Sequence, residues 1–189
     1  MKRFLLLLFM FFLILSVTTQ ALAFYTEFGT AYSRKKTSFD ANNYSDSESI
    51  TGSISLYFFE KIAIELSYTD ASSIRQEKIG GSQYTTYQKT KVLGADLIYV
   101  FADRKASFQP FIKGGGAQLT RQQTIQVDSL DRELLDPDVA VVPSYGAGFK
   151  LALTDSLNFK MSYDAWKTPI GGSLTTDDSQ IRAGLSWVL

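Results

Sequence analysis

Four acids and four bases lie within segments that are otherwise apolar or small. They are Glu27, Glu65, Asp96, Lys113, Lys150, Lys160, Asp164 and Arg182. Such groups can transfer protons in catalysis, or they can neutralise one another as ion pairs. The chain contains no His and no Cys, which removes the usual catalytic base, the commonest metal ligand and thiol chemistry. The composition therefore favours structural ion pairs, and we expect no catalytic residue, no cofactor and no metal ion.

The segments that carry these charges alternate between two kinds of residue. Residues 62–69, for example, are Ile-Ala-Ile-Glu-Leu-Ser-Tyr-Thr, in which every second side chain is large and apolar. A period of two indicates a β-strand with one apolar and one polar face. The pattern predicts eight strands, over residues 24–37, 46–59, 62–70, 85–101, 108–120, 140–153, 157–167 and 179–189.

The predicted connections between these strands alternate in length. Residues 60–61, 102–107 and 154–156 form short turns. Residues 38–45, 71–84, 121–139 and 168–178 form longer loops that are rich in Ser, Thr, Asp, Gln and Gly. This alternation predicts an all-β, eight-stranded antiparallel up-and-down barrel, with short periplasmic turns and longer extracellular loops.

Two orientations of the apolar face are compatible with eight alternating strands. A soluble lipocalin-like barrel would bury the apolar face, whereas a transmembrane barrel would turn it towards lipid. The polar face combines balanced charges with many Gly, Ala and Ser residues, which suit a narrow closed interior. A Lys or Arg facing lipid near the midplane would cost about 2–4 kcal/mol. Aromatic residues also cluster near both strand ends, as bilayer interfaces favour. We therefore predict a transmembrane β-barrel with the charges inside.

The first 23 residues have the features of a targeting segment. Lys2 and Arg3 precede an apolar run over 4–17, and Ala-Leu-Ala at 21–23 is a small-x-small cleavage site. We predict a cleaved secretory signal peptide over 1–23 and one barrel domain over 24–189. Removal of the peptide leaves 17 basic against 19 acidic residues. Because this balance is not basic, we expect no nucleic-acid partner.

Two stretches give the chain a resemblance to a known superfamily. They are Gln-Pro-Phe-Ile-Lys-Gly-Gly-Gly-Ala at 109–117 and the closing Ile-Arg-Ala-Gly-Leu-Ser-Trp-Val-Leu at 181–189. The chain resembles the eight-stranded bacterial outer-membrane β-barrels, which include the OmpA transmembrane domain, the OmpX/Ail proteins and OmpW. The resemblance implies a monomer in the bacterial outer membrane, in contact with its lipid and lipopolysaccharide.

The resemblance also implies that the closing strand is a signal for the outer-membrane assembly machinery. Its outward residues would be Ile181, Ala183, Leu185, Trp187 and Leu189. The family signal usually ends in Phe, and this chain departs from it with Leu189. Members of the superfamily that modify lipopolysaccharide acyl chains depend on a histidine. This chain has none, so we expect no enzymatic activity.

Two functions remain open. An eight-stranded barrel is just wide enough for its own side chains, so the eight charges would fill the lumen as an ion-pair network. In that network we expect Arg182 near Glu27, and Lys113 near Asp96 or Glu65. Such a barrel would have a structural or surface-interaction role. The alternative is an OmpW-like barrel through which small or apolar solutes permeate by a lateral opening.

Six cations near the predicted outer strand ends are candidates for contact with lipopolysaccharide phosphates. They are Arg34, Lys35, Lys36, Lys89, Lys91 and Arg121. Cations at such positions also occur simply because their long side chains reach the interface. The sequence does not separate these two interpretations.

Overall fold

A computed structural model describes residues 24–38, 43–128, 132–135, 137–171 and 174–189. The predicted signal peptide over 1–23 lies outside these residues. Within the described part of the chain, the elements are strands, and none is a helix long and apolar enough to cross a membrane.

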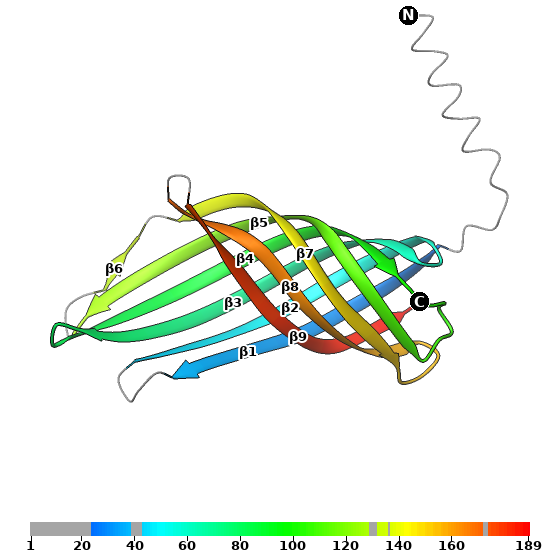
Figure 1. The fold of residues 1–189 in the computed structure, drawn as a ribbon, viewed down its shortest axis with the longest axis horizontal. Coiled ribbons are helices and arrows are strands. Elements are labelled where there is room, and N and C mark those ends of the chain that lie inside the picture. The colour runs from blue at the N-terminus through cyan, green and yellow to red at the C-terminus, as the bar shows by residue number, and fades with distance from the viewer. Residues whose placement is uncertain (1–23, 39–42, 129–131, 136, 172–173) are drawn as a thin grey trace, which may run out of the picture.

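The strands form one closed antiparallel barrel (Figure 1). Each long strand pairs with the next along the chain, and the last pairs with the first. A two-residue strand, β6 (Glu133–Leu134), adds to one edge of β5. The prediction of an all-β, eight-stranded up-and-down barrel is confirmed. Its eight long strands are β1 (Tyr25–Ser38), β2 (Tyr44–Phe59), β3 (Ile62–Ile79), β4 (Ser82–Val100), β5 (Phe108–Val127), β7 (Asp138–Ala152), β8 (Leu157–Gly171) and β9 (Leu174–Val188).

The register of the strands gives the barrel its tilt. We can start at Glu27 on β1 and move to the register partner on each neighbouring strand in turn, from β2 around the wall to β9. The residue reached on β9 is Asp178. Glu27 itself, however, is paired with Val188, which lies ten residues further along β9 (188 − 178 = 10). A stagger of this kind is required when tilted strands close into a barrel. It brings side chains from strands that are not neighbours to the same height in the lumen.

The strands extend further towards one end than the alternating pattern predicts. We call this end the loop end, and the end with the short turns near residues 60, 104 and 155 the turn end. The prediction of a loop over 71–84 is wrong, because β3 and β4 continue to a tight turn at Gly80 and Gly81, both with positive φ. Likewise β5 continues to Val127 rather than 120. Both faces of a strand are polar beyond the barrel wall, so the alternation stops although the backbone pairing continues.

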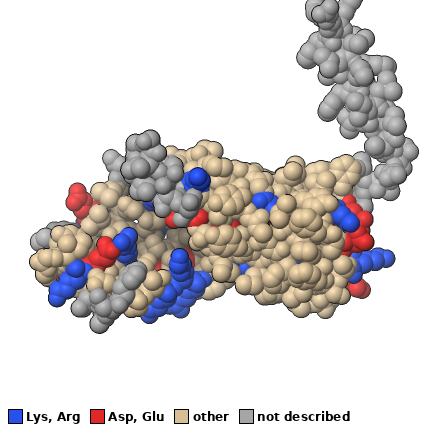
Figure 2. Space-filling view, viewed as in Figure 1, with Lys and Arg blue, Asp and Glu red and all other residues tan. Residues whose placement is uncertain are grey.

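The outward face of the barrel carries the large apolar side chains. Leu66, Leu93, Leu97, Ile112 and Leu185 are all outward and between 44% and 57% exposed. On the face in view, Figure 2 shows a largely uncharged band nearer the turn end, with charged side chains at that end and over the opposite half. This is the inverse of a soluble protein, in which apolar side chains of this size gather inside.

The lumen contains two apolar layers separated by charged side chains. The turn-end layer comprises Tyr25, Tyr57, Ala63, Ile98, Val100, Phe111 and Val188. The loop-end layer comprises Val92, Ala117, Leu119 and Val142, with Ala140 and Trp166 packed against it. The eight charges predicted from the sequence occupy the space around and between these two layers.

Candidate functional site: the lumen and the loop end

Lys113 is the hub of the charged network in the lumen. Its Nζ lies 2.7 Å from Asp164 Oδ1, 3.1 Å from Glu65 Oε1 and 3.3 Å from Asp96 Oδ2. These acids come from β8, β3 and β4, whereas Lys113 lies on β5. Lys160 of β8 reaches Glu65 Oε2 at 2.5 Å. The structure thus places Lys113 beside both of the acids that the sequence suggested for it. Side chains this deeply buried need such partners, because an isolated buried charge is very costly.

Lys150 and Glu27 form a second buried pair nearer the turn end. Lys150 Nζ donates to Glu27 Oε2 at 2.8 Å and to the Tyr57 hydroxyl at 3.0 Å. The predicted proximity of Arg182 to Glu27 is wrong. Arg182 Nε lies 3.4 Å from Asp164 Oδ2 instead. The stagger of the barrel explains the error, because Glu27 is the register partner of Val188 and not of Arg182.

Aromatic side chains pack inside the lumen near the turn end, where a cavity of about 540 Å³ reaches in to Tyr25 and Lys150. Tyr25 and Tyr57 stack with their ring centroids 4.1 Å apart, and the Arg104 guanidinium lies 4.4 Å above the Tyr25 ring. Two cavities beside the network measure about 20 Å³ each, room for about one water molecule. The described side chains therefore fill the middle of the barrel.

The six candidate lipopolysaccharide contacts divide between two faces. Arg34 and Lys36 lie on the outward face of β1, and are the next two outward residues after Tyr32 towards the loop end. Lys91 and Lys89 occupy the corresponding positions beyond Leu93. The remaining two, Lys35 and Arg121, lie on the inward face. Four of the cations thus follow the apolar band on the outer wall, and two line the interior at the loop end.

Arg34 forms an ion pair with Asp46 on the outward face. Its Nη2 donates to Asp46 Oδ2 at 2.9 Å, and its Nε donates to Asp46 Oδ1 at 3.3 Å. These hydrogen bonds hold the pKa of the Asp46 carboxyl below its usual value. The pair lies beyond the apolar band and is exposed to solvent. Lys36, Lys89 and Lys91 are three further cations on this face.

The barrel wall is split at the loop end. β1 and β9 pair from Glu27 with Val188 up to Tyr32 with Ala183. β7 and β8 pair only up to Ser144 with Trp166. Beyond these points, and among the described residues, the upper parts of β8 and β9 pair with each other alone. The upper β8–β9 hairpin therefore stands apart from the wall on both sides, and we call the separation between β1 and β9 the lateral gap.

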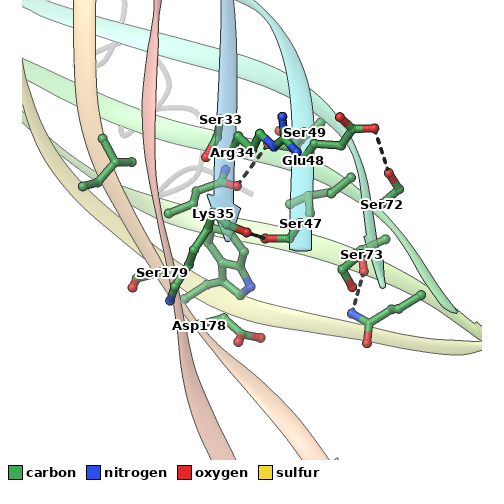
Figure 3. A pocket seen from close by; sticks show the side chains of 18 of the residues that line it. Ser33, Arg34, Lys35, Ser47, Glu48, Ser49, Ser72, Ser73, Asp178 and Ser179 are labelled. Atoms are coloured by element: carbon green, nitrogen blue, oxygen red, sulfur yellow. Dashed lines mark hydrogen bonds between the residues drawn. The ribbon is translucent and has the colours of Figure 1, made fainter. Parts of the chain in front are cut away.

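A cavity of about 400 Å³, which we call the cup, lies beside this gap. Outward residues Tyr163 and Ile181 contribute to its lining, so it extends through the gap towards the outer surface. Figure 3 shows Lys35 extending from β1 to the side where Asp178 and Ser179 of β9 lie. The inward lining consists mainly of hydroxyl, amide and apolar side chains, and includes Ser33, Lys35, Ser47, Ser49, Thr69, Ser73, Gln88, Thr90, Val92, Leu119, Arg121, Trp166, Asp178 and Gln180.

Sequence reasoning missed two contributors to these sites. Tyr57 has no role in the sequence-based predictions, yet it is buried and accepts a hydrogen bond from Lys150. Trp166 was given no role, yet it lines the cup. The strand period places both residues on the inward face, so their parity could have identified them. The proposed assembly-signal residues Ile181, Ala183, Leu185, Trp187 and Leu189 are all exposed on the outward side of the closing strand.

The chain is similar to a known family and to several solved barrels. The family model described as the outer membrane protein β-barrel domain matches residues 4–188. The N-terminal β-barrel domain of Pseudomonas aeruginosa OprF is 16% identical with a TM-score of 0.57, over 87% of this chain and 97% of that chain. Comparison with curated protein sequences finds no match.

Two other solved structures share the fold. Neisserial surface protein A is 13% identical with a TM-score of 0.52, over 87% of this chain and 96% of that chain. Yersinia pestis Ail, solved in complex with the heparin analogue sucrose octasulfate, is 10% identical with a TM-score of 0.56, over 88% of this chain and 99% of that chain. At these identities the similarity concerns the fold.

Proposed function

Because this chain belongs to the outer membrane protein β-barrel domain family, and hence to the bacterial outer membrane, we propose that it is a non-conducting barrel with a structural or surface-interaction role. The observation that carries the proposal is the network centred on Lys113, which joins β3, β4, β5 and β8 across the lumen. A pore needs a continuous aqueous path, and charged and apolar layers occupy that path here.

The same proposal assigns the outward cations to lipopolysaccharide. Arg34, Lys36, Lys89 and Lys91 follow the apolar band at the loop end, which we take to face the outside of the cell. Phosphate groups of the outer leaflet would meet the wall at this height, and charge-assisted hydrogen bonds to phosphate are strong. We infer no enzymatic activity, since the chain lacks His and Cys.

Planar-bilayer recordings test the closed lumen. We expect no large, stable current steps from the wild-type protein. We expect small steps from a Glu65→Ala/Lys113→Ala double variant, because it removes the central acid and base together and leaves space for water. Large steps from the wild type would contradict the proposal.

Lipopolysaccharide contact needs a separate measurement. Replacing Arg34, Lys36, Lys89 and Lys91 with Gln should reduce the thermal stabilisation that lipopolysaccharide gives to the barrel in lipid nanodiscs. A matched variant with Lys61→Gln and Lys105→Gln at the turn end is the control. An unchanged response in the first variant would remove this part of the proposal.

The lateral gap favours permeation of small or apolar solutes as a second candidate. In this function a solute would enter the cup and leave sideways between β1 and β9 instead of crossing the whole lumen. A disulfide between Cys residues at positions 34 and 181 would close the gap. Uptake of a small apolar dye by cells should then fall under oxidising conditions and recover on reduction. Unchanged uptake would exclude this candidate.

A further inference from the structure

We propose that the cup binds a saccharide that carries an anionic substituent, either a phosphate or a sulfate group. This inference rests on the proposed surface-interaction role and names the ligand chemistry that such a role would use. Of the four outward cations, Arg34 also lines the cup, whereas Lys36, Lys89 and Lys91 do not. Most of the lining side chains point inward and lie above the loop-end apolar layer.

The size and the polar walls of the cup suit a sugar. Its volume of about 400 Å³ lies within the range of small-molecule sites. Its walls present hydroxyl and amide groups, several of them already oriented by hydrogen bonds. Gln88 Nε2 donates to Thr90 Oγ1 at 3.1 Å, and Ser49 Oγ lies 3.3 Å from the side-chain amide of Gln180. Groups that both donate and accept are the natural partners of sugar hydroxyls.

The inner end of the cup supplies an apolar surface. Trp166 packs against the loop-end layer, which includes Leu119, and both residues line the cavity. One face of a pyranose ring carries mainly C–H groups and can lie against an aromatic or aliphatic surface. An indole ring combines a large apolar area with a polar N–H, so it suits such a contact.

Arg121 supplies the reason for an anionic substituent. Its side chain is 18% exposed, and its ion pair with Asp178 Oδ2 is long, at 3.5 Å. Its Nε is buried without a hydrogen-bond partner among the described residues. Buried donors are almost always satisfied, so an unpaired one calls for a partner. A phosphate or sulfate group can accept two parallel hydrogen bonds from a guanidinium. Lys35 adds a second cation to the lining.

The ligand could come from either of two sources. The lateral gap connects the cup with the outer leaflet, where phosphorylated sugars are anchored by lipid. The loop end is also open to the surrounding medium, from which a soluble acidic glycan could enter. The chemistry is shared, and the two sources require separate arms of one experiment.

Trp166 provides the signal for this experiment. The chain has two Trp residues, and Trp187 lies on the outward face near the turn end. A Trp187→Phe variant therefore reports from the cup alone. In phosphatidylcholine nanodiscs, its fluorescence is titrated with a sulfated heparin disaccharide and with the unsulfated disaccharide. In the second arm, the same variant is compared in nanodiscs with and without lipopolysaccharide.

We expect a fluorescence change with the sulfated disaccharide, with lipopolysaccharide, or with both, and the responding arm identifies the source. Adding Arg121→Gln should weaken binding about ten-fold or more, because it removes charge-assisted hydrogen bonds. Lys105→Gln, at the turn end and outside the lining of the cup, is the matched control and should leave binding unchanged. Far-UV circular dichroism confirms that each variant is folded.

Absence of a response in both arms would overturn the proposal. Equal binding of the unsulfated disaccharide, or a response that Arg121→Gln leaves intact, would also overturn it. These outcomes are independent of the closed lumen, because a barrel that conducts ions could still bind a ligand in the cup. Failure of this inference can therefore be told apart from failure of the proposed function.

Discussion

Lys150 and Glu27 form a buried ion pair of 2.8 Å across the lumen, although 123 residues separate them in the chain. Lys150 lies on β7 and Glu27 on β1, so the pair joins two strands that are not neighbours. Their side chains are 3% and 1% exposed. The pair forms only when the barrel is closed, which links the ionic contact to the closure of the wall.

Lys150→Met should strongly destabilise the barrel. The substitution leaves Glu27 buried without its nearest cation, which typically costs about 3–5 kcal/mol. The free energy of unfolding, measured by urea titration in lipid vesicles, should fall accordingly. Lys89→Met on the exposed outward face should change it by less than about 0.5 kcal/mol. The double variant Glu27→Leu/Lys150→Met should recover much of the loss, and failure to recover would assign the effect to packing.

Gly184→Val should impair closure of the barrel. Gly184 faces inward, and a Cβ at this position would overlap the carbonyl oxygen of Thr30 and lie 2.5 Å from Ala31 Cα on β1. Because backbone atoms cannot move aside easily, we expect a loss of about 1–3 kcal/mol or more. Gly52→Val is the matched control, since no described atom lies within 4 Å of a Cβ there. Equal unfolding free energies for the two variants would contradict the close approach of β1 and β9.

Cysteine pairs should map the end of the β1–β9 seam. The chain has no native Cys, so introduced pairs can be followed without interference. Tyr32→Cys with Ala183→Cys should form a disulfide readily, because these residues are register partners. Arg34→Cys with Ile181→Cys, one alternation further, should cross-link much more slowly, because the strands have separated there. Non-reducing gel electrophoresis measures both rates, and equal rates would mean that the lateral gap closes in the membrane.

Arg34→Gln should raise the pKa of Asp46 towards its usual value. The hydrogen bonds from Arg34 lower this pKa in the folded protein. A lowered native pKa means that the pair contributes to stability above the ordinary pKa of Asp, and that this contribution is lost as the pH falls through the lowered value. Carboxyl chemical shifts in an NMR titration report the change. Ser47→Ala, at the neighbouring position, should leave the titration of Asp46 unaltered.

The alternation of residues within each strand determined the fold and the inward direction of the charges. A one-residue change of register would turn Glu65, Asp96 and Lys113 towards lipid, so the pattern permits one orientation. The same pattern failed beyond the apolar band, where β3 and β4 continue to Gly80. There both faces of a strand meet water, and the hydrophobic signal disappears while the hydrogen bonds remain.

The pairing of the charges was decided by the tertiary structure. The sequence identifies which side chains enter the lumen, but their heights depend on the stagger accumulated around the whole wall. That stagger places Lys150, and not Arg182, beside Glu27. The cup and the lateral gap have the same origin. They depend on where β1 separates from β9 and where β7 separates from β8. The sequence contains no periodic pattern that reports contacts between distant strands.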